Sequence, residues 1–128
     1  MNETVREWMA KAEADFATAK RELAAKDSPN YDAVCFHSQQ SVEKLMKAAL
    51  IQRGVTPPKT HDLVQLDQLI RSEWRDWTSP LEDLRFLTRA AVALRYPGES
   101  AEMDMAEEAV ETAGQLRERL LLLLGTER

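Results

Sequence analysis

Four polar side chains between Tyr31 and Arg53 recur at spacings that a helix would align. They are His37, Gln40, Lys44 and Lys47. Successive helical residues turn by about 100°, so His37, Gln40 and Lys44 place an imidazole, a carboxamide and an ammonium on one side. This row of hydrogen-bond donors with one titratable ring is the first candidate functional site. The alternative is a solvated helix face with a capping or packing histidine.

A second group of polar side chains lies further along the chain. Arg85 and Arg89 are one helical turn apart, and Arg95 and Tyr96 continue the strip. Guanidinium groups beside a phenol suit a phosphate with its base or sugar. In the alternative interpretation the arginines pair with acidic residues of the last predicted helix, such as Glu107 and Glu111.

The two groups define one hypothetical site. If the strip from Arg85 to Tyr96 packs near His37, Gln40 and Lys44, donors from two helices would line a single groove. His61 is a further candidate for chemistry, although a histidine at a helix start is more often a local hydrogen-bonding residue.

The order of residues along most of the chain, from about residue 3 to 124, resembles the HEPN family. In the second predicted helix it rests on Ala33, His37, Gln40, Glu43, Lys44, Lys47 and Ala48. These are followed by Gly54, the run PPKTHDL at 57–63 and RYP at 95–97. The resemblance implies a small all-helical domain that forms two-fold homodimers. It also implies a partner protein, often a minimal nucleotidyltransferase, in a two-component system of toxin–antitoxin type.

Many HEPN proteins are metal-independent ribonucleases, and the resemblance indicates where their catalytic motif would lie. It is an arginine followed after four to six residues by a histidine, sometimes with a tyrosine two residues beyond the histidine, near the end of the penultimate helix. Here Arg89 and Tyr96 fit the pattern, but Leu94 stands where the histidine belongs. No imidazole is then available to take the proton of the 2′-hydroxyl, a role typically contributing about 10²–10⁴-fold in rate.

The sequence therefore favours a non-catalytic module that binds a nucleotide or short RNA together with a partner. Two alternatives stay open. One is a ribonuclease that uses His37 or His61 in a displaced geometry, and the other is a purely structural dimerisation protein.

The elements that must position these residues are all helical. Apolar periodicity predicts helices over residues 3–26, 31–53, 62–71, 81–94 and 101–124. Four long helices and a short one in the longest crossover indicate one all-α domain over residues 1–128. The expected architecture is an antiparallel up-and-down four-helix bundle. The predicted buried face of the second helix comprises Val34, Cys35, Ser38, Val42, Leu45, Met46, Ala49 and Leu50.

Several other positions have predicted roles in this bundle. Trp74 and Trp77 should cover one end of it. Ser79 should cap the fourth helix, Ser100 the last one, and Met105 should lie in the core.

Composition excludes several classes of protein. The chain carries a net charge of −5, which argues against broad non-specific nucleic-acid binding but not against a local basic site. A single cysteine and the absence of metal-binding spacings argue against a disulfide framework, a metal or a cofactor. No apolar run is long enough to cross a membrane, so we expect a cytoplasmic protein.

Overall fold

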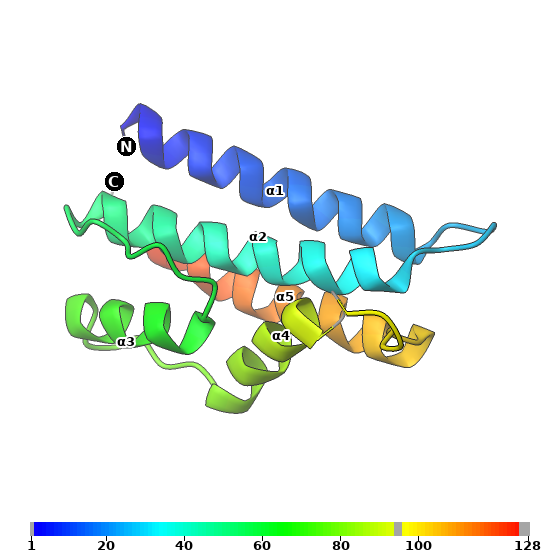
Figure 1. Cartoon of the computed structure of the whole chain (residues 1–128). Coiled ribbons are helices and arrows are strands. Elements are labelled where there is room, and N and C mark those ends of the chain that lie inside the picture. The colour runs from blue at the N-terminus through cyan, green and yellow to red at the C-terminus, as the bar shows by residue number, and fades with distance from the viewer. Residues whose placement is uncertain (1, 94–95, 126–128) are drawn as a thin grey trace.

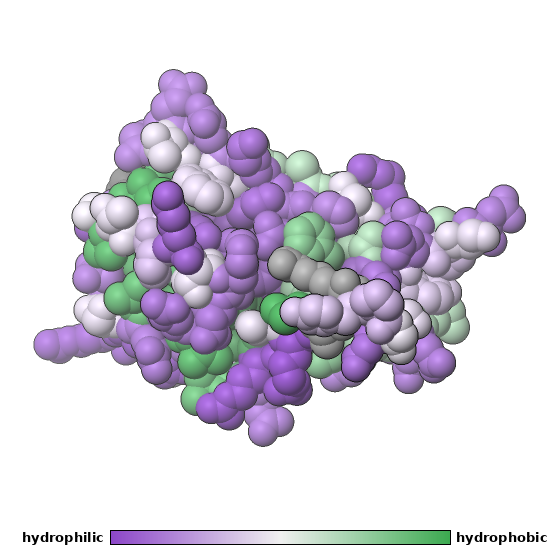
Figure 2. Space-filling view, in the orientation of Figure 1, coloured by the Kyte–Doolittle hydropathy of each residue, from purple (hydrophilic) through white to green (hydrophobic). Residues whose placement is uncertain are grey.

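A computed structural model describes residues 2–93 and 96–125 and contains five helices and no strand within those ranges. The helices are α1 (Glu3–Leu23), α2 (Tyr31–Gln52), α3 (Leu63–Glu73), α4 (Leu81–Ala93) and α5 (Met103–Gly125). The all-α bundle with a short helix, α3, in the longest crossover is confirmed. In the view of Figure 2 the surface is mostly hydrophilic, with small apolar areas between.

The helix α2 is the centre of the fold. It contacts all four other helices, whereas α1 contacts only α2 and α5 among the described elements. Figure 1 shows α1 and α2 lying side by side and antiparallel, with α3 and α4 on the opposite side of α2. Because α2 is covered from several directions, 13 of its 22 residues are buried.

Local chemistry explains where the helices begin. The side chain of Asn2 accepts a hydrogen bond from the amide of Val5 at 2.8 Å, and Asn30 does the same for Ala33 at 3.0 Å. Asp62 accepts from Val64 at the start of α3. Each cap satisfies an amide that has no partner inside its helix, so the helix starts are encoded in sequence.

The core agrees with the predicted apolar face of α2, of which every member is buried. Cys35 belongs to this face. Burial, with a smaller contribution from the charge of Asp32, raises the pKa of its thiol from 9.0 to about 11. The thiolate is therefore scarce at neutral pH, and Cys35 acts as a packing residue.

Three predicted roles are wrong. The hydroxyl of Ser79 donates to the side chain of Asp67 at 2.7 Å and does not cap α4. Ser100 does not cap α5, which begins at Met103, where the amide of Ala106 bonds the carbonyl of Glu102. Met105 is 37% exposed and lies outside the core.

Candidate functional site

A buried carboxylate, Glu43 of α2, is the centre of a polar cluster. Its side chain is only 4% exposed. One oxygen accepts from Lys47 Nζ at 2.9 Å. The other accepts from His61 Nδ1 at 2.9 Å, Gln39 Nε2 at 3.0 Å and Gln40 Nε2 at 3.1 Å. Four donors thus converge on one carboxylate.

These contacts set the charge state of Glu43. Burial alone raises the pKa of a carboxyl group, but hydrogen bonds from Lys47, Gln39 and His61 outweigh it and bring the pKa of Glu43 below its ordinary value. The carboxylate is therefore ionised at neutral pH and is a poor base. It orients the groups around it.

The crossover between α2 and α3 brings His61 to this cluster. The amide of Gln39 donates to the His61 carbonyl at 2.9 Å. Two residues on, the Leu63 amide donates to Thr88 Oγ1 of α4 at 3.2 Å. The His61 loop is therefore fastened to α2 on one side and to α4 on the other.

His61 also has the geometry of a carboxylate-oriented imidazole. Nδ1 faces the Glu43 carboxylate, which favours the tautomer with its proton on Nδ1. The side chain is 62% exposed, and Nε2 makes no hydrogen bond to the described residues. The neutral ring thus presents an acceptor nitrogen to solvent.

A second carboxylate, Asp15 of α1, joins His37 and Lys44. Asp15 Oδ1 lies 2.8 Å from His37 Nδ1, and its Oδ2 accepts from Lys44 Nζ at 2.6 Å. The structure thus divides the predicted row: His37 and Lys44 share Asp15 of α1, whereas Gln40 belongs to the Glu43 cluster within α2. Lys47, expected on a solvated face, is 8% exposed. This face is therefore not solvated at Lys47.

Two members of the arginine strip, Arg85 and Arg89, lie on α4. Arg85 and Arg89 are exposed, and Tyr96 is 65% exposed. Among the described residues neither arginine forms an ion pair, so the pairs with Glu107 and Glu111 of the alternative interpretation are absent. Leu94 and Arg95 lie outside the described residues.

The two predicted groups do not form one hydrogen-bonded site. In the described part of the chain, His37, Gln40 and Lys44 bond residues of α1 and α2, and none bonds α4. The His61 loop bonds α4 next to the strip, where the Leu63 amide donates to Thr88 Oγ1.

Sequence reasoning missed the partners Asp15 and Glu43. A signal for Asp15 was present, because it lies between Ala12 and Ala19 on the buried side of α1. Glu43 and His61 are 18 residues apart across an irregular crossover, so no spacing rule pairs them.

Within residues 2–93 and 96–125, no group of three His, Cys, Asp or Glu side chains could hold a metal ion. No helix in the same ranges is both long enough and apolar enough to span a bilayer.

The fold and the polar clusters define a small helical-bundle domain built around a central helix with buried carboxylates. The family model for the HEPN domain matches residues 5–123. This chain belongs to the HEPN family.

Two solved structures have similar folds. TT1696 from Thermus thermophilus is 24% identical with a TM-score of 0.78, and the match covers 96% of this chain and 99% of that one. ST0689, described as an archaeal HEPN homologue, is 20% identical with a TM-score of 0.69, and the match covers 99% and 100% of the two chains. No curated protein matches the sequence.

Proposed function

We propose that this HEPN protein is a cytoplasmic module that binds a nucleotide or short RNA on the exposed strip of α4. The proposal rests on the exposure of Arg85 and Arg89 and on their lack of ion pairs. They lie one turn apart, exposed, with no carboxylate partner among the described residues. By contrast, Lys44, Lys47 and Arg117 are held by Asp15, Glu43 and Glu13. Exposed cations without a counter-ion suit phosphate oxygens.

The proposed module binds without cleaving. Leu94 occupies the position at which the ribonuclease motif of the family requires histidine. A leucine cannot take a proton, so the strip supplies phosphate contacts but no base.

The first test is titration of a short fluorescein-labelled RNA, followed by anisotropy at two salt concentrations. Arg85→Ala with Arg89→Ala should raise Kd by about tenfold or more, since each arginine loses a charge-assisted hydrogen bond. The slope of log K against log salt should fall by about 0.7 per arginine. The matched control replaces Lys11 and Arg21, two exposed cations of α1, by alanine. Equal losses in both double variants would contradict a local site.

A second candidate function follows from the His61–Glu43 pair. His61 Nε2 would take the 2′-hydroxyl proton as that oxygen attacks phosphorus. The bond from phosphorus to the 5′ oxygen would then break, and water would protonate the leaving oxygen. The products are a cyclic phosphate and a 5′-hydroxyl. Metal-free cleavage of the same RNA that disappears in His61→Ala but persists in His37→Ala would establish this candidate over the first.

The exposed face of α4 also suits a two-fold contact. Besides the arginines it presents Leu81 and Val92, 40% and 41% exposed, and Tyr96 and Met103 follow at 65% and 54%. An isologous interface would place two copies of the arginine strip across one axis, where a bound anion offsets their repulsion. We propose a homodimer on this face and a partner of the nucleotidyltransferase kind implied by the family.

Sedimentation of the pure protein tests the homodimer. We expect a dimer at tens of micromolar, and Val92→Asp should shift it towards monomer because a carboxylate would be buried in the contact. Leu122→Asp changes an exposed leucine on another face and should leave the dimer intact. A monomeric native protein would rule out the shared strip. Co-expression with a nucleotidyltransferase should yield a complex that survives gel filtration; separate elution would exclude that partner.

A further inference from the structure

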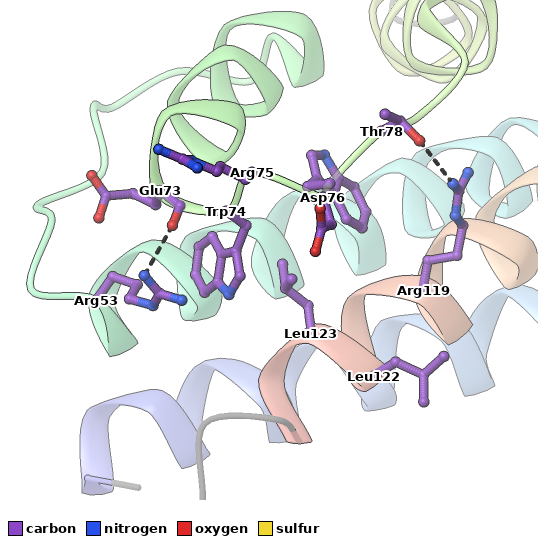
Figure 3. Close-up of a pocket in the computed structure, with 10 residues that line it drawn as sticks. Arg53, Glu73, Trp74, Arg75, Asp76, Thr78, Arg119, Leu122 and Leu123 are labelled. Carbon is purple, nitrogen blue, oxygen red and sulfur yellow. Dashed lines mark hydrogen bonds between the residues drawn. The ribbon is translucent and has the colours of Figure 1, made fainter.

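A separate cleft of about 600 Å³ lies between the loop that follows α3 and the C-terminal half of α5. We call it the tryptophan–arginine cleft, and it is lined by Arg53, Trp74, Trp77, Arg119, Leu122 and Leu123. Figure 3 shows Arg53 and Arg119 at its two ends, with Trp74 and Leu123 between them. Its volume falls in the usual range of small-molecule sites.

Both end arginines lie over indole rings. The guanidinium carbon of Arg53 is 4.3 Å from the centroid of Trp74, and that of Arg119 is 5.7 Å from the centroid of Trp77. Arg53 also donates to the Glu73 carbonyl at 2.9 Å. A guanidinium fixed on a ring loses little conformational freedom when it binds an anion, and its outer face can stack on a further planar group.

A buried hydrogen-bond network holds the wall of the cleft. Asp67 of α3 is fully buried and accepts from Trp77 Nε1 at 2.7 Å, Ser79 Oγ at 2.7 Å and Arg71 Nε at 2.6 Å. Arg71 also donates to the carbonyl of Ser79 at 3.0 Å. The loop is thus fixed without a ligand, so the cleft is preformed.

The charges around the cleft set the kind of ligand. With Arg75 the lining has three guanidinium groups, against the carboxylates of Glu73 and Asp76, a net of one positive charge. A polyanion such as RNA would meet those carboxylates, whereas a monoanion would match the net charge. Trp74 and Trp77 are 8% and 6% exposed, and the side chain of Leu122, 72% exposed, forms an apolar edge.

We infer that the tryptophan–arginine cleft binds a small ligand in which one anionic group is attached to an aromatic ring. The anion pairs with one end arginine, and the ring lies against the leucines and the outer face of the other guanidinium. This site is independent of the proposed RNA strip on α4.

The experiment uses anilinonaphthalene sulfonate, an aromatic monoanion whose fluorescence rises on binding, and its uncharged relative phenylnaphthylamine. The chain has three tryptophans, so in a Trp8→Phe background only Trp74 and Trp77 can transfer excitation energy to the bound probe. We expect the sulfonate to bind about tenfold more tightly than the neutral probe, and Arg53→Gln or Arg119→Gln to remove about tenfold of its affinity. Arg21→Gln, at an exposed arginine of α1, is the matched control and should have no effect.

Competition identifies what the cleft recognises. Naphthalene sulfonate should displace the probe, while inorganic sulfate and short RNA should not. Leu122→Asp, an exposed change that leaves the arginines intact, should also weaken binding. Probe binding indifferent to Arg53→Gln, Arg119→Gln and Leu122→Asp, or displacement by sulfate or RNA alone, would overturn the assignment. The RNA titration of the variant Arg85→Ala with Arg89→Ala tests only the α4 strip, so either result there leaves the cleft assignment unchanged.

Discussion

Replacing Glu43 by alanine should lower the free energy of unfolding by about 3–5 kcal/mol, the usual range for removing one partner of a buried ion pair. The substitution would leave several buried donors without their acceptor. Lys47, whose side chain is 10% exposed, would keep a positive charge without its carboxylate. The amides of Gln39 and Gln40 would lose an acceptor as well. Urea unfolding followed by circular dichroism measures the change.

A surface carboxylate gives the matched control. Glu111 is exposed on α5, and Glu111→Ala should change the free energy of unfolding by less than about 0.5 kcal/mol. A loss below about 1 kcal/mol in Glu43→Ala would mean that water satisfies the freed donors, and that the cluster contributes little to stability.

The same carboxylate makes stability depend on pH. The pKa of Glu43 is lowered in the folded protein from the ordinary value of 4.5. The unfolded chain therefore binds a proton first as pH falls, so the contribution of Glu43 is fully present above its unfolded pKa and disappears below its folded pKa. Glu43→Gln should accordingly flatten the fall in unfolding free energy between neutral and strongly acidic pH. If the unfolding free energy fell equally with pH in the native protein and in Glu43→Gln, the pKa of Glu43 would not be lowered.

The second large effect is expected at Asp67. Asp67→Ala should cost about 3–5 kcal/mol in unfolding free energy, since the indole N–H of Trp77 and the hydroxyl of Ser79 would both be left buried without an acceptor. Because Trp77 reports on the same loop, its fluorescence should shift to longer wavelength in the folded variant. Thermal and urea unfolding with both probes measure the effect.

Gln68 is the control for Asp67, since it is the next residue of α3 and is exposed. Gln68→Ala should be nearly neutral. Asp67→Asn keeps the shape but turns an N–H group towards at least one donor, so it should fall between alanine and the native protein. A native-like Asp67→Ala would show that the loop is held by Trp74 and the arginines instead.

The helices could be placed from the amino-acid sequence, because the forces that start and end a helix act over a few residues. Asn2, Asn30 and Asp62 cap their helices through amides two or three residues away. The apolar face of α2 was likewise readable, since periodicity reports which side of a helix avoids water. Leu94 at the motif position follows from the sequence as well.

The state of the polar side chains depended on the way the helices pack. Whether Lys47 is solvated or buried depends on α1, whose Trp8 ring has its centroid 5.8 Å from the Lys47 ammonium, and the periodicity of α2 does not contain this packing. The partners Asp15 and His61 are distant in sequence from His37 and Glu43, by 22 and 18 residues. By local rules Ser79 was a suitable helix cap, yet its hydroxyl donates a hydrogen bond to the carboxylate of Asp67, 12 residues earlier. Lys47 has a local partner, Glu43, four residues earlier on α2. For His37, His61 and Ser79, however, the fold and not the local sequence supplied the carboxylate.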